Sequence, residues 1–341
     1  MAHIAMVVTN ACAPDPRVER HARWLVEEGH IVDIFAWDRT KQHPELEQRH
    51  GYRIHRKQYG WTKKAGAIRT WIRKFQFISE LAINADLLIL NDTDTAKVEF
   101  DGKKLLDMHD MAHTWPLMRS NSYIHRLASK WMLEDARKIM KDADAIITSA
   151  PGFQKWIESE GHNSTVVMNR RNPQLSTKID EEVVGYFGRI RDYQSIELMI
   201  TAAHLAGFRV ITAGDGLAVE KMLANHPEID YRGPFTEEDL PGLISEISVM
   251  YAMYSTERGN IKQGAIPTKM LDAAAFGKPS VVNRNTPMGK LCKQESLGVT
   301  APYGDVIKIA EALDKAHGMT IENVRGEDRE VFLSVIQKLL N

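Results

Sequence analysis

The sequence predicts an α/β protein with two similar domains, each a parallel sheet covered by helices. The chain has 341 residues, which is long for a single domain. Apolar strand-like runs alternate with amphipathic helical segments, a pattern typical of repeated strand–helix–strand units. The pattern is interrupted by a polar stretch near residue 175 and then starts again. We therefore expect a first domain over 1–175, a second over 176–325 and a terminal helical segment over 326–341.

The elements of the first half follow from local patterns. Apolar residues recur at a helical spacing from Arg17 to His30, and Gly29 is placed to end that helix. A second helix is expected over 121–141. The strand-like runs are residues 3–10, 31–37, 85–92, 103–110, 143–150 and 164–169.

The second half repeats this alternation. Strand-like runs are expected at 183–190, 208–216, 229–235, 248–255 and 280–282. Helices are expected at 194–206, 217–225, 236–245, 267–276 and 305–316. The last amphipathic segment, 329–340, is expected to be a helix that crosses back to the first domain.

Composition excludes several classes of protein. The formal net charge is −1, which gives no overall attraction to nucleic acid. Only two cysteines occur, a count that favours a reducing, cytoplasmic compartment over a disulfide framework. No apolar run reaches the roughly 20 residues that span a bilayer. The opening ten residues have no basic n-region and are expected to form a strand instead of a signal peptide.

The segment 264–282 has the features of an anion site. Pro267 suits the first turn of a helix, and Gly277 suits its end. Free N–H groups at such a start favour an anion, and Lys269 would add a positive charge. Asp272, one turn later, could accept hydrogen bonds from hydroxyls. A plain capped amphipathic helix explains the same pattern equally well.

The motif P-x-K-x-x-D-x-x-A-x-G-x-P-x-V-V in this segment resembles a signature of retaining GT-B glycosyltransferases, in particular the large fourth family. Other segments resemble that family in the same order: "APDPRVERHARWLVEEGHIVDIFAW", "LLDMHDMAH", "DADAIITSAPGF", "VVGYFGRI" and "VITAGDG". The resemblance covers nearly the whole chain. It implies two Rossmann-like domains facing across a cleft, with a nucleotide-sugar donor held mainly by the second domain and an acceptor by the first.

The resemblance also implies roles for residues of the second domain. Arg189 would bind the donor diphosphate with its planar guanidinium, and Lys269 would be a second phosphate contact. Asp272 stands where the family usually has a glutamate that binds the donor ribose. The remaining implied donor-binding residues are Gly188, Gly214, Gly216 and Pro267. The family needs no cofactor and no essential metal, because basic side chains and helix N–H groups stabilise the leaving diphosphate.

In the first domain the resemblance implies that His109 lines the sugar or acceptor site and acts in catalysis beside Asp110. A histidine paired with a neighbouring carboxylate for structure alone is an equal alternative. Other residues expected to line the acceptor site follow predicted strands: Asn10, Asp15, Arg17, Asp92 and Asp94. Asp92-Thr-Asp94 also resembles a metal-binding Asp-x-Asp motif, but we expect no metal there.

Two departures from the family pattern keep other functions open. Gln194 or Ser195 stands where the family usually has a second lysine, and Gly264 stands where it has a first glutamate. A missing cation would weaken stabilisation of the diphosphate by about 2–4 kcal/mol. Arg191 or Lys269 could compensate. The alternatives are a GT-B-shaped nucleotide- or glycan-binding protein with little activity, and a nucleotide-sugar epimerase.

A basic and aromatic segment lies in the first half. Residues 48–79 contain nine lysines and arginines and no acidic residue. The helical part includes Arg69, Trp71, Arg73 and Lys74. This combination favours an anionic membrane surface or a lipid-linked acceptor, whereas a solvated helix packed on the sheet is an equal alternative. The overall prediction is a cytoplasmic, peripheral-membrane glycosyltransferase of the hexosyltransferase type.

Overall fold

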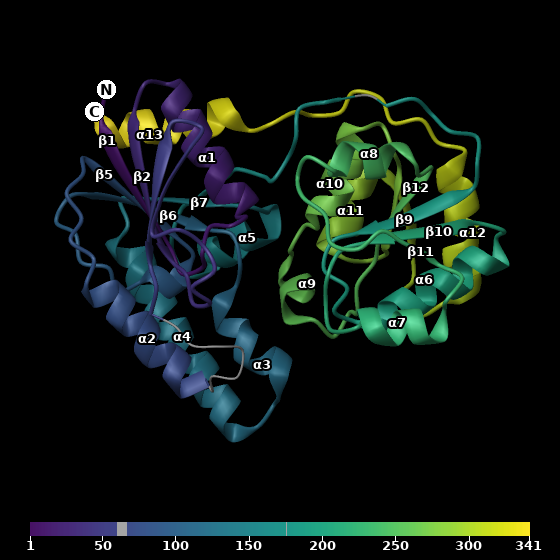
Figure 1. Ribbon diagram of the computed structural model, residues 1–341, viewed down its shortest axis with the longest axis horizontal. Coiled ribbons are helices and arrows are strands. Elements are labelled where there is room, and N and C mark those ends of the chain that lie inside the picture. Colours follow the sequence, from purple (N-terminus) through teal and green to yellow (C-terminus); the bar gives the residue numbers. More distant parts are fainter. Residues whose placement is uncertain (60–66, 175) are drawn as a thin grey trace. The chain divides into compact units, whose positions relative to one another are not determined.

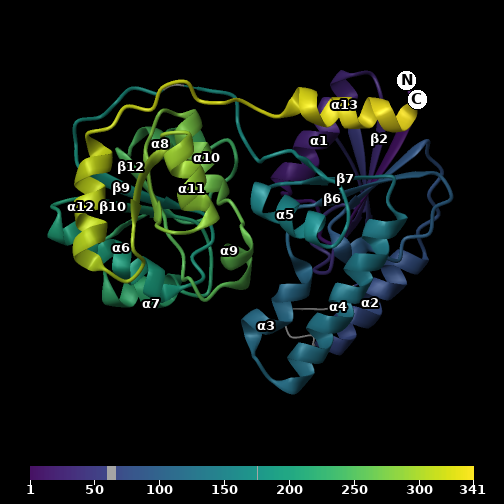
Figure 2. The same cartoon turned by 180° about the vertical axis from the view of Figure 1, so that it is seen from behind.

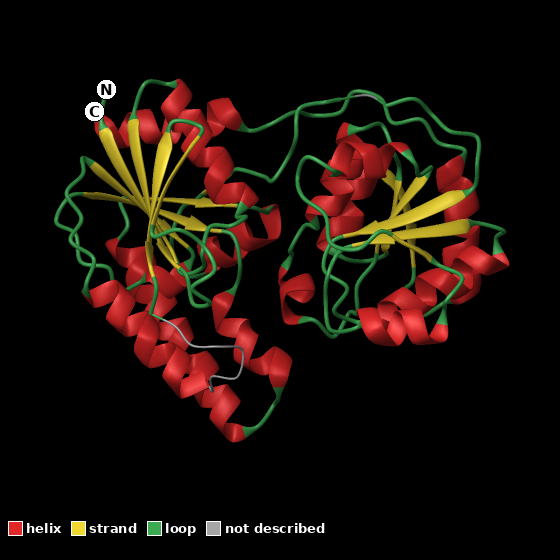
Figure 3. Ribbon diagram, viewed as in Figure 1, coloured by secondary structure: helices red, strands yellow, loops and turns green. Residues whose placement is uncertain are grey.

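The structure is a computed structural model that describes residues 1–59, 67–174 and 176–341, without the side chains of 67, 68, 118 and 119. The chain divides into two compact α/β units (Figures 1 and 3). The first unit contains residues 1–168 and 328–341, and the second contains residues 169–327. The predicted boundary, residue 175, lies outside the described residues. The C-terminal helix belongs to the first unit, as expected.

The first unit contains an eight-stranded sheet in the order β3-β4-β2-β1-β5-β6-β7-β8. Every neighbouring pair is parallel except β3 and β4, which form an antiparallel pair at the edge. The strands are β1 (His3–Val8), β2 (Ile31–Trp37), β3 (Leu46–Arg49), β4 (Tyr52–Lys57), β5 (Leu87–Asn91), β6 (Lys103–Met108), β7 (Ala145–Thr148) and β8 (Thr165–Val166). The edge pair is a feature that the alternation pattern did not predict.

The helices of the first unit are α1 (Pro16–Glu27), α2 (Ala67–Ser79), α3 (Trp115–Arg119), α4 (Tyr123–Asp142), α5 (Pro151–Ser159) and α13 (Arg329–Leu340), with short 3-10 turns η1 (Thr93–Thr95) and η2 (Ala112–Thr114). The last helix, α13, packs beside α1 (Figures 1 and 2). Phe332 of α13 stacks on His21 of α1 with ring centroids 4.2 Å apart. Burying this aromatic face ties the end of the chain to the core of the first unit.

The second unit contains a fully parallel six-stranded sheet in the order β11-β10-β9-β12-β13-β14. Its strands are β9 (Val183–Phe187), β10 (Arg209–Ala213), β11 (Asp230–Tyr231), β12 (Val249–Ala252), β13 (Ser280–Asn283) and β14 (Gly298–Ala301). Its helices are α6 (Tyr193–Leu205), α7 (Val219–Asn225), α8 (Leu240–Ser245), α9 (Gly259–Gln263), α10 (Thr268–Ala275), α11 (Pro287–Gln294) and α12 (Val306–His317).

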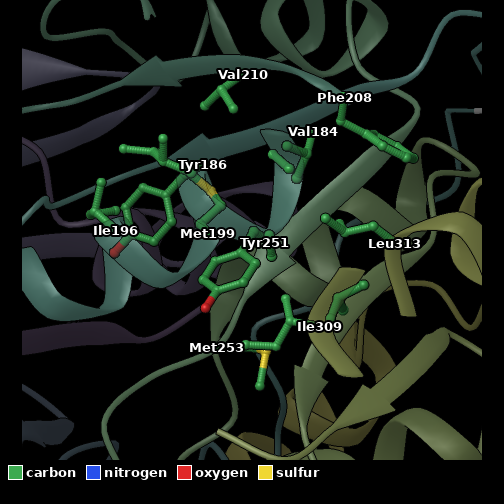
Figure 4. Packing of buried hydrophobic residues seen from close by; sticks show 14 of the residues in the cluster. Val184, Tyr186, Ile196, Met199, Phe208, Val210, Tyr251, Met253, Ile309 and Leu313 are labelled. Carbon is green, nitrogen blue, oxygen red and sulfur yellow. The ribbon is translucent and has the colours of Figure 1, made fainter. Parts of the chain in front are cut away.

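The central strand of the second unit is buried on both faces, as helices on both sides of a parallel sheet require. Val184 and Tyr186 point into one hydrophobic cluster, whereas Val183 and Phe187 point into the other. Figure 4 shows the first cluster, in which Tyr186 packs near Tyr251. Alternation along β9 therefore fixes its register between the two helical layers.

Strand order reverses once in each sheet, and this positions the candidate sites. In the first unit β1 lies between β2 and β5, and in the second β9 lies between β10 and β12. Loops leave such neighbouring strands in opposite directions, so the carboxyl ends of the strands leave room for a ligand. Among the described residues, no helix combines the length and apolar character needed to cross a membrane.

Candidate functional site

The loops after β9 and β10 meet at the strand-order reversal of the second unit. Gly188, Gly214 and Gly216 all have positive φ, at 131°, 131° and 149°. A Cβ on Gly214 would lie 2.0 Å from the Gly188 carbonyl oxygen, and one on Gly216 would lie 2.1 Å from the Ile190 oxygen. Glycine is therefore required at both positions, because the two loops cross in contact. The crossing holds Arg189 at the carboxyl end of the sheet.

Arg189 is the most accessible cation of this arrangement. Its side chain is 65% exposed, and its Nε lies 3.5 Å from a carboxylate oxygen of Asp215. An exposed ion pair of this length contributes little to stability. The guanidinium can therefore leave Asp215 for a bound anion at small cost.

Lys269 lies one layer deeper, on α10, whose N-cap residue is Pro267. Its Nζ is 3.2 Å from the centroid of the Tyr186 ring and 5.3 Å from that of Tyr254. The same ammonium would be 3.7 Å from a Cβ on Gly188. Burial, with a further contribution from the positive charge of Arg258, holds the pKa of Lys269 well below its usual value. A bound anion would favour its charged form.

Asp272 is already engaged in an ion pair. Its carboxylate accepts from the Nε of Arg171 at 2.6 Å, and Arg171 also contacts Glu237. A ribose hydroxyl would therefore have to share Asp272 with Arg171. Lys269 lies next to Gly188, the residue before Arg189. Asp272 is on the same helix, one turn further along.

The first departure from the family pattern, the missing lysine, leaves two uncharged residues that are held by local hydrogen bonds. Ser195 is buried and is hydrogen-bonded to Asp192 at 2.7 Å and to Tyr303 at 2.8 Å. Gln194 is the second residue of α6, and its backbone N–H donates to the side chain of the N-cap residue Asp192. Neither residue supplies a charge to the site.

Arg258 is a basic residue that sequence reasoning missed. Its guanidinium lies 5.4 Å from the centroid of the Tyr254 ring, after β12, and its charge acts on Lys269. The signal in the sequence was an arginine three residues after the strand-like run 248–255, just before Gly259. Arg258 therefore acts on Lys269, which itself lies beside Gly188, the residue before Arg189.

The first unit has a different polar cluster at its own strand-order reversal. Asp92 follows β5 with φ 65°, a conformation that is uncommon for a residue other than glycine. One carboxylate oxygen accepts from the backbone N–H groups of His109 and Asp110, at 2.9 Å each. The other lies 3.0 Å from Nε2 of His109. Asp92 therefore fixes both the backbone and the ring of His109.

Proton affinities in this cluster are strongly altered. Burial raises the pKa of the Asp92 carboxyl to about 7, an effect that the nearby positive charge of His109 opposes. Burial alone would lower the pKa of His109, but the charges of Asp92 and Asp107 raise it. Asp92 and His109 therefore alter each other's proton affinity, and such a pair is suited to exchange protons with a ligand.

Three other predicted residues of the first unit follow β1, and one of them is buried. Arg17 is 4% exposed, and its guanidinium forms an ion pair with Asp107, in which Nη2 lies 2.7 Å from a carboxylate oxygen. Its place is in the interior, beneath His109. Asn10 donates to Asp15 at 2.7 Å, and Asp15 caps α1. Asn10 and Asp15 thus shape the loop after β1.

Asp94 and Asp110 complete the polar edge of the first sheet. Thr9, which follows β1, donates its hydroxyl to Asp94 in η1. Asp110 accepts from the indole N–H of Trp115 at 3.0 Å. The Thr9–Asp94 bond connects the carboxyl ends of β1 and β5, and the bonds of Asp92 to the backbone of His109 and Asp110 connect those of β5 and β6. Within the described ranges, no group of three or more His, Cys, Asp and Glu side chains is placed to hold a metal ion.

The basic helix is α2, although residues 60–66 of the predicted basic segment lie outside the described residues. Arg69 and Arg73 are exposed, Lys74 is half-buried, and Trp71 is 42% exposed. The Trp71 ring packs on Phe75 of its own helix and on Trp131 of α4, with centroids at 4.8 and 5.4 Å. One edge of α2 is therefore packed and the other is open.

Comparison with known proteins identifies the second unit. Residues 181–318 match the family model described as Glycosyl transferases group 1. Most of the second unit is therefore similar to a group 1 glycosyltransferase domain. The matched residues include Arg189, Lys269, Asp272 and Arg258. No curated protein matches the chain by sequence.

Several solved structures share the fold of the whole chain. Sucrose-phosphate synthase from Thermosynechococcus elongatus has 16% sequence identity and a TM-score of 0.73, covering 100% of this chain and 95% of that one. HepE from Anabaena, in complex with UDP and glucose, has 15% identity and a TM-score of 0.68, covering 100% and 99%. S. aureus TarM, in complex with Fondaparinux, alpha-GlcNAc-glycerol and UDP, has 10% identity and a TM-score of 0.69, covering 100% of both chains. The predicted GT-B fold is confirmed.

Proposed function

We propose that this protein is a retaining glycosyltransferase that moves a sugar from a nucleoside-diphosphate sugar to a glycan or lipid-linked acceptor. The group 1 glycosyltransferase domain supports the reaction class. Similar structures bind UDP, as their descriptions state, which supports a uridine diphosphate donor. The observation that carries the proposal is the group of basic residues at the strand-order reversal of the second unit.

In this proposal the donor diphosphate lies against the Gly188–Arg189 loop. Arg189 binds it bidentately, and Lys269 becomes charged as the phosphate approaches. Arg258 takes the place of the lysine that is absent at Gln194–Ser195. These cations stabilise the negative charge that develops on the leaving diphosphate. The chemistry then needs no cofactor or essential metal.

The acceptor lies in the first unit. His109, held by Asp92, contacts the sugar or the acceptor hydroxyl and supplies or takes up a proton there. Asp94, Asp110 and Asn10 line the same edge of the sheet and can hydrogen-bond to hydroxyl groups. We also propose that the protein works in the cytoplasm at an anionic membrane surface, which Arg69, Arg73 and Lys74 would attract.

A donor screen tests this proposal. UDP-glucose, UDP-N-acetylglucosamine and GDP-mannose are each added to the purified protein, and thermal unfolding and diphosphate release are measured. A donor at about 100 times its dissociation constant would stabilise the fold by about 2.7 kcal/mol. If no nucleotide sugar raises the melting temperature, the proposal is wrong. Binding without any turnover would favour the alternative of a nucleotide-binding protein, which the uncharged Gln194–Ser195 pair already suggests.

A further inference from the structure

A groove lies between helices α2, α3 and α4 of the first unit. Helices α2 and α4 lie side by side in both views (Figures 1 and 2), and they meet at the rings of Trp71 and Trp131, whose centroids are 5.4 Å apart. The cavity measures about 680 Å³, within the range of small-molecule sites. The residues that line it belong to the first unit, so the groove is a feature of that unit alone.

Indole rings form much of the wall of the groove. Trp71, Trp115 and Trp131 line it, together with apolar side chains such as Ile124 and Met132. Trp71 is 42% exposed and Trp131 is 41% exposed, so both rings are open to solvent. Aromatic rings that line a hollow in this way are suited to pack against a ligand.

Polar side chains interrupt these apolar walls. Thr93, Asp94 and Asp135 contribute oxygen atoms to the lining, and Lys74 and His125 contribute nitrogen atoms. The carboxylates accept hydrogen bonds, the ammonium donates them, and the threonine hydroxyl does both. The groove therefore offers hydrogen-bond donors and acceptors beside its aromatic rings.

The fixed charges around the groove offset one another. The carboxylates of Asp94 and Asp135 are matched by the ammonium of Lys74, which also lines the groove, and by that of Lys97, which lies 3.7 Å from Asp135. An anionic ligand would meet two carboxylates, and a cationic ligand would meet two ammonium groups. The lining is therefore complementary to an uncharged ligand.

A purely apolar ligand fits this lining less well than a sugar does. Hydrocarbon would take water away from two carboxylates and an ammonium and would give them no hydrogen bonds in return, which is unfavourable. A sugar ring meets both demands. Its C–H faces can pack on indole rings, while the hydroxyl groups around its rim exchange hydrogen bonds with the polar lining.

The groove also adjoins the polar edge of the first sheet. Trp115, in its wall, donates its indole N–H to Asp110 at 3.0 Å. Asp94, also in its wall, is two residues after Asp92, whose carboxylate lies 3.0 Å from Nε2 of His109. A sugar chain in the groove would therefore have one end beside the proposed acceptor edge.

We propose that the groove binds the uncharged sugar rings of a glycan acceptor, with the rings packed on Trp71 and Trp131 and their hydroxyl groups bonded to Asp94 and Asp135. The inference rests on the proposed function, because it names the substrate class of the first-unit site. A neutral oligosaccharide, and not a lipid chain, is then the part of the acceptor that this groove recognises.

Titration of neutral trisaccharides into the full chain tests the groove. Maltotriose, cellotriose, mannotriose and triacetylchitotriose are the probes, and saturation-transfer NMR measures binding through their ring C–H protons. We expect at least one to bind. Trp131→Leu keeps an apolar side chain but removes the ring, so the affinity should fall by about tenfold. Trp131→Phe restores a ring and should recover part of it.

The matched control is Tyr123→Leu. Tyr123 is an aromatic residue of the same helix, is 79% exposed and is not among the residues that line the groove. This variant should bind the trisaccharide as the wild type does. The melting temperature of each variant shows whether a loss of binding comes from a loss of folding.

The outcomes separate the groove from the proposed function. Failure of all four trisaccharides to bind, or equal affinity in wild type and Trp131→Leu, would overturn the proposal. Binding of octanol or octyl phosphate in place of the sugars would mean that the groove takes hydrocarbon, and a dimer lost in Trp131→Leu would mean that a second copy covers it; either result also overturns it. Stabilisation by UDP is measured in parallel: its absence with trisaccharide binding intact would reject the proposed function and not the groove.

Discussion

The two units use the same sheet position for opposite charges. At the strand-order reversal of the second unit the side chains are cationic: Arg189 and Lys269, with Arg258 beside them. At that of the first unit they are anionic: Asp92 contacts His109, and Asp94 accepts a hydrogen bond from Thr9. Fold alone therefore does not decide the ligand, because both edges offer the same loop geometry. In the proposed function, the cationic side chains would bind the diphosphate in the second unit, and the polar edge of the first unit would bind a hydroxyl acceptor.

The largest effect is expected from removing the exposed cation of the second unit. Arg189→Ala should lower kcat for the accepted nucleotide sugar by about 10²–10³-fold, because the variant lacks one positive charge that stabilises the leaving diphosphate. The fold should be unaffected, since the side chain is 65% exposed. Diphosphate release measures the rate. Arg209→Ala, at the amino end of β10 and 52% exposed, is the matched control. Equal losses in both variants would show that the effect is not local.

A smaller loss is expected from the histidine of the first unit. His109→Ala should lower kcat by about 10²-fold, the lower end of general acid–base contributions. Donor affinity, measured by thermal shift with UDP, should not change, because the second unit carries donor binding. Weaker UDP binding in His109→Ala would contradict this division of roles.

Asp92→Asn tests how the carboxylate of the first unit controls the pKa of His109. The charge of Asp92 is one of two that raise the pKa of His109 against the effect of burial. Removing it should lower that pKa. His109 would then lose its proton at lower pH, which histidine NMR can follow. An unchanged titration would mean that Asp107 alone sets the pKa.

Lys269 should link donor binding to pH. Burial lowers its pKa in the free protein, and a bound diphosphate should raise it. Between those two pKa values binding takes up a proton, so UDP affinity falls as pH rises, by about tenfold per pH unit at most. Calorimetry in buffers of different ionisation enthalpy measures the proton. Lys269→Met should bind UDP without that proton uptake, and uptake that persists would assign it to another group.

The smallest effect is expected at the ribose contact. Asp272 is shared with Arg171, so its net contribution to nucleoside binding should be about 1 kcal/mol, or roughly fivefold in affinity. Asp272→Asn should reduce the preference of the protein for UDP over its 2′,3′-dideoxy analogue. If the variant keeps the full preference, the ribose is recognised elsewhere.

Much of the fold followed from periodicity and turn chemistry. The pattern around Pro267 and Gly277 predicted a helix at 267–276, and α10 spans Thr268–Ala275. The predicted helix at 236–245 begins only at Leu240, because Pro241 is favoured in the first turn of a helix. The edge pair β3–β4 escaped prediction, since its residues are largely polar and its pairing is decided by the neighbouring β2.

The sequence by itself determined the two α/β units, the helix carrying Lys269 and Asp272, and the loop carrying Arg189. These are local properties, fixed by strand and helix periods and by glycines that tolerate positive φ. Only the tertiary structure decided that Arg17 is buried on Asp107, that Asp272 is shared with Arg171, and that Arg258 lies by Lys269. Burial and charge pairing depend on residues distant in the chain, so no local pattern encodes them.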